Sequence, residues 1–155
     1  GNIYQYACGM NDQNNASSVK AGPVAGYNWV RTNVDKFLGQ EDVDAEKLIL
    51  AIPFYTRLWT EKYGSLDLSS KIYTMEDCES FLDKYNVTTV YDENAGQNYA
   101  EYKQGSLTYK LWIEDHDSVK RRVETVKKYN LAGITAWRKG FETNGTWQVI
   151  TENLK

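Results

Sequence analysis

Almost continuous apolar runs, which are typical of strands buried on both faces, occur at three places in the chain. They are Ile3–Met10, Leu48–Tyr55 and Ala132–Trp137. An amphipathic helix is expected at about Tyr27–Leu38, between the first two runs, and another at about Ser118–Tyr129, before the third. Asp117 is the expected N-cap of the second helix. Buried strands that alternate with helices predict a parallel sheet covered by helices, and so an α/β fold.

The middle of the chain follows a different pattern. A helix at about Met75–Tyr85 leads to three runs of alternating polarity at Thr88–Tyr91, Asn98–Lys103 and Leu107–Ile113, separated by glycine-containing turns. This order predicts a small antiparallel α+β unit inserted into the parallel pattern. A last short helix is expected at about Trp147–Asn153.

Three parallel strands cannot close a barrel, which requires eight, and they leave two sheet edges unpaired. We therefore expect either that the rest of a barrel precedes Gly1 or that copies of the chain associate to cover these edges. Both alternatives concern the partners of this chain as much as its fold.

Polar and aromatic residues follow each of the predicted parallel strands. In (β/α) barrels the reactive groups lie at these carboxyl ends. The residues are Asn11, Asp12 and Gln13 after the first strand, Tyr55, Thr56, Arg57 and Trp59 after the second, and Trp137, Arg138 and Lys139 after the third. Together they suit a carbohydrate with polar substituents. Each also has a simpler reading, in which Trp137 is in the core, Arg57 pairs with a local acid and Asp12 caps a turn.

Composition narrows the class of ligand. A net charge of -3 argues against nucleic acid, and no apolar run approaches the ~18 residues of a membrane span. Cys8 and Cys78 lack metal-ligand spacing, and the sequence leaves open whether they are free buried thiols or a disulfide. The five Trp and twelve Tyr fit either a sugar-binding cleft or a tyrosine-rich core.

A resemblance to a known family rests on four ordered stretches that cover nearly all of the chain. The segment Ile52–Trp59 (IPFYTRLW) is similar to the signature of glycoside hydrolase family 18, and more narrowly to its bacterial spore-cortex peptidoglycan N-acetylglucosaminidases. The other three stretches are Asp12–Gln13 with Ala21–Val24 and Trp29–Val30, then Asp92–Tyr102, and then Tyr129–Gly133 through Trp137 to Glu142.

The resemblance implies a fold and a reaction. The parallel strands would be the sixth to eighth of a (β/α)8 TIM barrel, with residues 1–60 and 114–155 in the barrel and 61–113 as the insertion. The activity would be substrate-assisted retaining hydrolysis of β-1,4-linked N-acetylglucosamine glycans of peptidoglycan or chitin type. No cofactor or metal is expected. The polysaccharide is the expected partner, with neither nucleic acid nor membrane, and the location would be secreted or at a bacterial cell envelope.

The resemblance also assigns residues. Asp12 matches the strand-six aspartate that orients the N-acetyl group, Trp137 matches the strand-eight tryptophan, and Tyr55 and Arg57 match the rim of strand seven. Asn11 stands where the family has a tyrosine, which favours the alternative of a non-catalytic glycan-binding or degenerate module. The further substrate-binding candidates are Gln13, Gln97, Asn98 and Tyr99.

The catalytic glutamate is expected to be absent from these residues. The family's acid motif is D-x-x-D-x-D-x-E, whereas Asp42, Asp44 and Glu46 are preceded by Gly39 at its first position. This run also enters a strand instead of ending one, which places it at the opposite face of a barrel. We therefore expect the chain alone to be inactive, Glu114 to be a surface acid, and His116 to neighbour a helix cap.

Overall fold

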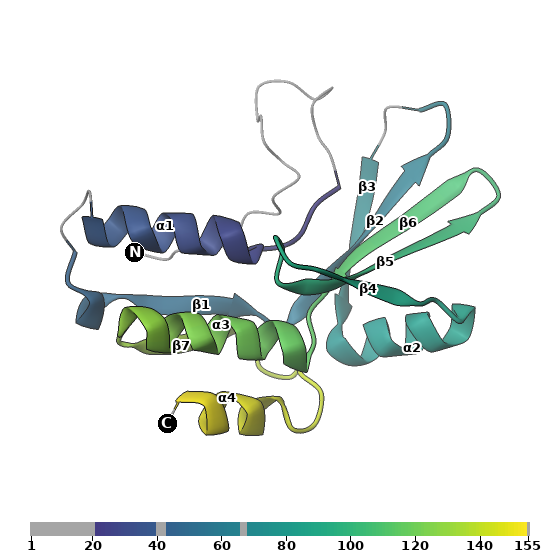
Figure 1. Ribbon diagram of the computed structural model, residues 1–155. Coiled ribbons are helices and arrows are strands. Elements are labelled where there is room, and N and C mark those ends of the chain that lie inside the picture. Colours follow the sequence, from purple (N-terminus) through teal and green to yellow (C-terminus); the bar gives the residue numbers. More distant parts are fainter. Residues whose placement is uncertain (1–20, 40–42, 66–67, 155) are drawn as a thin grey trace.

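The computed structural model describes residues 21–39, 43–65 and 68–154, and Figure 1 shows the arrangement of their elements. The helices are α1 (Tyr27–Gly39), α2 (Met75–Tyr85), α3 (His116–Tyr129) and α4 (Thr146–Leu154), with a 3-10 turn at Ala45–Lys47. The strands are β1 (Ile49–Pro53), β2 (Tyr55–Lys62), β3 (Leu68–Thr74), β4 (Thr89–Asp92), β5 (Gln97–Gln104), β6 (Leu107–Ile113) and β7 (Gly133–Trp137). The predicted run Ile3–Met10 lies outside the described residues.

Strands β1 and β7 form a parallel pair in which Ile49 lies opposite Gly133 and Pro53 opposite Trp137. Along β1, the side chains of Leu50 and Ile52 are buried, while that of Ile49, the first residue of the strand, is 50% exposed. The predicted parallel strands are thus confirmed for the second and third runs. One face of β1 is covered by helices, and the alternation follows from the two-residue period of a strand.

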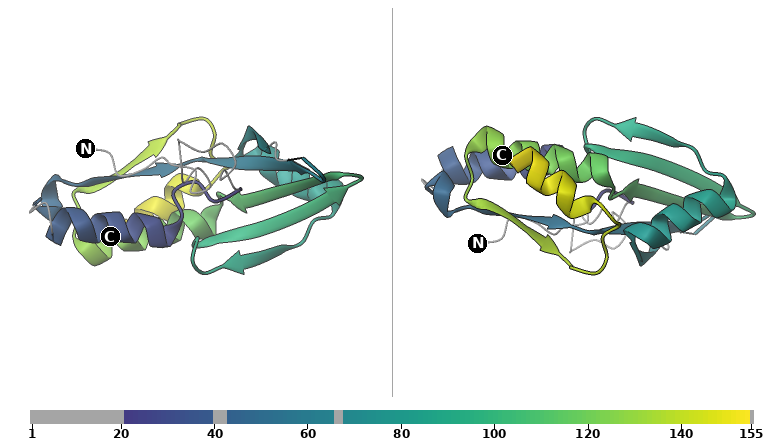
Figure 2. Two further views of the ribbon diagram at one scale, coloured as in Figure 1. Left: turned by 90° about the horizontal axis from the view of Figure 1, so that it is seen from above. Right: turned by 90° about the horizontal axis from the view of Figure 1, so that it is seen from below.

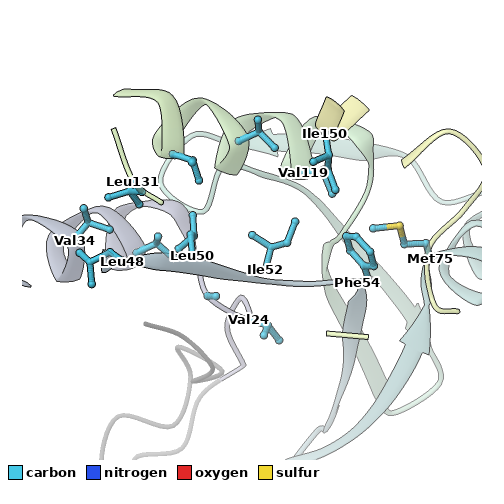
Figure 3. Close-up of a cluster of buried hydrophobic side chains, with 14 residues drawn as sticks. Val24, Val34, Leu48, Leu50, Ile52, Phe54, Met75, Val119, Leu131 and Ile150 are labelled. Atoms are coloured by element: carbon cyan, nitrogen blue, oxygen red, sulfur yellow. The ribbon is translucent and has the colours of Figure 1, made fainter. Parts of the chain in front are cut away.

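The core on the covered face joins β1 to α1, α3 and α4 and includes Met75, the first residue of α2. Figure 3 shows Leu50, Ile52 and Phe54 directed toward the same cluster as Val119 of α3 and Ile150 of α4. The buried residues of this cluster are Val24, Ala25, Val30, Val34, Leu48, Leu50, Ile52, Phe54, Met75, Val119, Val123, Val126, Leu131 and Ile150. Burial of a branched aliphatic side chain stabilises a fold by roughly 1.5–3 kcal/mol, so this cluster fixes the helices against β1.

The N-cap of α3 is Asp115 and not Asp117 as predicted. The Asp115 carboxylate accepts a hydrogen bond from the Ser118 amide at 2.9 Å, and the Ser118 hydroxyl accepts one from the Asp115 amide at 3.0 Å. This reciprocal capping box satisfies two donors that the first helical turn leaves unpaired, so the helix begins two residues earlier than the apolar pattern indicates.

The second sheet has five antiparallel strands in the order β3-β2-β6-β5-β4, and α2 lies along one of its faces (Figure 2). The predicted helix and three strands are confirmed, while β2 and β3 are additional. A second core, formed by Leu58, Cys78, Phe81, Ala100, Leu111 and Ile113, joins α2 to this sheet. Because β2 begins at Tyr55, only Phe54 separates the parallel pair from the five-stranded sheet. The boundary at residue 60 stays a prediction.

Cys78 is a free thiol buried in this second core, whereas Cys8 lies outside the described residues. Burial raises the pKa of Cys78 to about 12, although Thr56 opposes the rise through a hydrogen bond. At neutral pH fewer than one thiol in ~10⁴ is therefore ionised in the folded chain. We expect iodoacetamide to leave Cys78 unmodified at pH 7.5 and to alkylate it fully in denaturant, as measured by mass spectrometry of the Cys78 peptide. Rapid alkylation under native conditions would contradict the burial.

Candidate active-site rim

The carboxyl ends of β1 and β7 meet at an exposed tryptophan. Pro53 lies opposite Trp137, and the Phe54 amide donates to the Trp137 carbonyl at 2.7 Å. The Trp137 side chain is 59% exposed, so it is not the core residue that the simpler reading of the sequence assumed. Trp137 and Tyr55 line the same small apolar hollow, together with Val24, Ala25, Ala51, Ile52 and Pro53. The two predicted rim residues are therefore brought together.

Tyr55 is half-buried at the start of β2. Burial raises the pKa of its hydroxyl. The positive charge of the nearby Arg57 opposes this rise, and the negative charge of Glu114 adds to it. The phenol therefore stays protonated and can donate a hydrogen bond to a ligand oxygen while its ring packs against an apolar surface.

Arg57 is held by a hydroxyl and an aromatic ring. Its Nη1 donates to the Ser70 Oγ at 2.7 Å, and its guanidinium lies 5.6 Å from the centre of the Trp59 ring. Its Nε is buried without a hydrogen-bond partner among the described residues. Trp59 is itself buried, with its Nε1 donating to the Gly22 carbonyl at 2.7 Å. This arrangement fixes the guanidinium on the sheet.

Arg57 shares a sheet face with further aromatic side chains. Trp59 lies opposite Lys110, Lys110 opposite Glu101, and Tyr99 opposite Trp112 in the antiparallel register. These residues alternate with Leu58, Ala100 and Leu111, which face α2. Arg57, Tyr99 and Trp112 therefore lie on the face that α2 does not cover. Sequence reasoning missed Trp112, although its alternation with Leu111 and Ile113 was a usable signal.

The three candidates at the start of β5 have different surroundings. Gln97 is fully buried and its Nε2 donates to Glu114 Oε1 at 2.8 Å, so its amide is engaged within the chain, and its role as a substrate contact stays a prediction. The Asn98 amide donates to Asp115 at 2.8 Å. Tyr99 is part-buried and donates its hydroxyl to Glu101 at 2.9 Å, which holds the pKa of Glu101 below its usual value. Asn98 and Tyr99 stay predictions as substrate contacts.

Glu114 is buried, and the expectation of a surface acid is wrong. Its two oxygens accept from the Arg122 Nη1 and Nη2 at 2.8 and 2.9 Å, and Ser118 Oγ donates at 2.8 Å. Burial raises the pKa of this carboxyl, and Arg122 and then Ser118 oppose the rise. Arg122 also donates to the carbonyls of Val24 and Ala25 at 3.3 and 3.0 Å. The pair thus ties the five-stranded sheet and α3 to the segment that lines the hollow.

The remaining candidates contribute little to this rim. Asn11, Asp12 and Gln13 lie outside the described residues. Glu46 is exposed in the turn that precedes β1. It therefore lies at the amino end of this strand, whereas Trp137 lies beside its carboxyl end. His116 is exposed within the first turn of α3, and its Nε2 lies 3.4 Å from the Thr143 hydroxyl. Within the described ranges, no cluster of histidine, cysteine and acidic side chains could hold a metal ion.

Comparison with known proteins places this fold and rim in a family. The model of the family described as "Glycosyl hydrolases family 18" matches residues 2–141. The chain belongs to glycoside hydrolase family 18. The description of this family names glycosyl hydrolases, and the match extends over nearly the whole chain.

Individual relatives agree with the family 18 assignment. The chain is 29% identical over 129 residues to the "Putative sporulation-specific glycosylase YdhD" of Bacillus subtilis. The matched region covers 81% of this chain and 30% of that protein. It is 25% identical over 137 residues to the "Uncharacterized glycosylase YvbX" of the same organism, with 86% and 38% covered. This chain therefore spans less than two fifths of either relative.

A solved structure shows the same fold. The spore cortex-lytic enzyme SleL of Bacillus megaterium superposes with a TM-score of 0.79 at 18% identity, over 99% of this chain and 40% of that one. The mixed α/β arrangement of family 18 domains is thus present here. Among the described residues, no helix has both the length and the apolar character needed to cross a membrane.

Proposed function

We propose that this chain forms strands six to eight, and the insertion after strand seven, of a (β/α)8 glycosidase that cleaves β-1,4-linked N-acetylglucosamine glycans. The observation that carries the proposal is the meeting of exposed Trp137 with Tyr55 at the carboxyl ends of paired parallel strands, in a chain of family 18. Spore cortex-lytic relatives favour peptidoglycan as the substrate, and hence an envelope or secreted location.

The side chains of the rim suit the proposed chemistry. In substrate-assisted hydrolysis the N-acetyl oxygen of the sugar attacks the anomeric carbon, so the enzyme supplies no nucleophile. Trp137 would support the apolar face of the sugar that is cleaved, and Tyr55 would donate a hydrogen bond to it. Asp12 would orient the N-acetyl group, with Asn11 and Gln13 beside it. Arg57, with its guanidinium fixed by Ser70 and Trp59, would contact sugar hydroxyls along the insertion.

The proton donor is proposed to lie outside these 155 residues. Protonation of the leaving oxygen requires a carboxylic acid at the same rim as Trp137. Glu46 is at the other end of β1, and Glu114 has its carboxylate enclosed by Arg122, Ser118 and Gln97. The positions of these two acids support a proton donor outside these residues.

A direct test compares the complete protein with the 155-residue chain. We expect the complete protein to release reducing ends from peptidoglycan or chitin oligomers with retention of the anomeric configuration, as followed by NMR of the first product. The isolated chain should give no turnover. Hydrolysis by the isolated chain would show that its acid is among these residues, and an inverted product would exclude the substrate-assisted route.

The alternative is a non-catalytic glycan-binding module, and Asn11 is the observation that favours it. The Asn amide can donate a hydrogen bond but is shorter than tyrosine and has no ring. If the complete protein binds glycan without cleaving it, and Asn11→Tyr restores cleavage, the module reading holds. If the complete protein is already active, that reading is excluded.

A further inference from the structure

A second hollow, which we term the distal groove, lies on the face of the five-stranded sheet that α2 covers. It encloses ≈ 330 Å³ and is lined by Leu58, Lys71, Tyr73, Asp77, Ser80, Phe81, Lys84, Tyr85 and Tyr109. In the β2–β3 register Leu58 lies opposite Lys71, whereas Arg57 lies opposite Ile72. Adjacent strand positions face opposite sides of a sheet, so the sheet itself separates the distal groove from the rim.

The wall of the distal groove is a continuous cluster of aromatic rings. The Phe81 ring lies 4.9 Å from Tyr85, 5.9 Å from Tyr73 and 6.1 Å from Tyr109, measured between ring centres. Phe81 and Tyr85 come from α2, while Tyr73 and Tyr109 come from β3 and β6 (Figure 1). The hydroxyls of the three tyrosines make no hydrogen bond to the described chain. Apolar ring surface beside unoccupied hydroxyls is the composition of a sugar-binding surface.

The charges at this groove are unbalanced. Lys71 lies 5.1 Å from the centre of the Tyr73 ring, and Lys84 lies 5.1 Å from that of Tyr85. Neither ammonium pairs with a carboxylate in the described chain, in contrast to Lys110, which lies 2.7 Å from Glu61. The one acid of the groove, Asp77, uses its Oδ2 to accept from the Thr74 amide in the cap of α2. The groove thus has two lysine ammonium groups without a carboxylate partner in the described chain, in a protein whose net charge is -3.

We propose that the distal groove binds a carboxylate-bearing stretch of an N-acetylglucosamine polymer, separately from the rim. The two lysines would contact the carboxylate, while the tyrosine hydroxyls, Ser80 and the free Asp77 Oδ1 would meet sugar hydroxyls. This inference rests on the proposed function, because the same polymer would occupy both surfaces. A second contact on one strand raises its effective concentration at the rim, so long acidic chains gain affinity and short neutral oligomers do not.

The test uses the complete protein and two soluble polymers with one backbone, carboxymethylated chitin and neutral glycol chitin, in affinity electrophoresis. The variant Lys71→Ala/Lys84→Ala should bind carboxymethylated chitin about tenfold more weakly than the wild type and glycol chitin equally well. The matched control Lys120→Ala/Lys128→Ala removes the same charge from exposed positions of α3, one of which also contacts a ring. It should leave both affinities unchanged.

Three results would overturn the proposal. The first two are an unchanged affinity of the groove variant for carboxymethylated chitin and an equal loss of affinity in the control. The third is stronger competition by polyglutamate than by free carboxymethylated oligomer, which would identify an acidic peptide as the occupant.

Turnover of neutral chitin oligomers distinguishes failure of the distal-groove proposal from failure of the proposed function. If that turnover is normal while the groove variant binds as wild type, only the distal groove is wrong. If the complete protein neither binds nor cleaves glycol chitin, the proposed function fails and the groove proposal fails with it.

Discussion

Replacing Arg122 with methionine is expected to lower the free energy of unfolding by about 3–5 kcal/mol. The substitution leaves the Glu114 carboxylate buried without the two guanidinium contacts at 2.8 and 2.9 Å. It also removes the donors to the Val24 and Ala25 carbonyls. The cost arises mainly from the unpaired buried charge, since methionine nearly preserves the packed volume. Urea unfolding of the complete protein, followed by far-UV circular dichroism, measures the effect.

The double variant Glu114→Gln/Arg122→Met separates charge from packing. Because it removes both buried charges and keeps a side chain of the glutamate's shape, it should recover more than half of the stability lost in Arg122→Met. Arg121→Met is the matched control: Arg121 is the neighbouring residue of α3, where it lies 3.4 Å from Glu124 and 4.2 Å from the Tyr27 ring centre. A partly exposed pair of this kind contributes at most about 1 kcal/mol. Equal losses for Arg121→Met and Arg122→Met would contradict the assignment.

The buried pair also shows where sequence reasoning reached its limit. Glu114 follows the apolar run of β6, and nothing in the local pattern distinguishes it from a surface acid. Its partner did carry a signal, because Arg122 stands between Val119, Val123 and Val126 on the apolar stripe of α3. A charged residue at a buried helical position requires a partner of opposite charge, but the pattern does not identify which acid it is.

The secondary structure could be predicted wherever local period and burial agree. The bounds predicted for α2 coincide with those observed, because its apolar face and its Thr74–Asp77 capping box act together. Strand β3 was missed because most of its residues are exposed, so it lacks an apolar face that alternation could reveal. Its position depends on pairing with β2, which is a tertiary contact.

The candidate site was predicted in the same uneven way. Tyr55 and Trp137 could be placed together because the carboxyl ends of parallel strands meet at one edge. Gln97 could not be placed, since its position at the start of β5 is the same in sequence whether its side chain faces a groove or Glu114. The two-residue period of a strand assigns a face only after the register with its neighbours is known.

Replacing Trp137 with alanine is expected to lower kcat/KM of the complete protein on N-acetylglucosamine oligomers by roughly 50–100-fold. A pyranose that covers ~100 Å² of the indole would lose about 2.5 kcal/mol of burial, and each ~1.4 kcal/mol is tenfold in rate. The stability should change little, because 59% of the side chain is already exposed. Steady-state kinetics on a chromogenic oligomer, together with the melting temperature of each variant, measure both effects.

The comparison with other aromatic substitutions makes this expectation specific. Trp137→Phe keeps part of the flat surface and should retain activity between those of the wild type and Trp137→Ala. Tyr63→Ala removes a ring that is almost fully exposed beyond the end of β2, so it should leave kcat/KM unchanged. If Trp137→Ala is as active as Tyr63→Ala, the exposed indole does not support the sugar. The hollow that it shares with Tyr55 would then not be the site of cleavage, because any glycan bound there must lie against this ring.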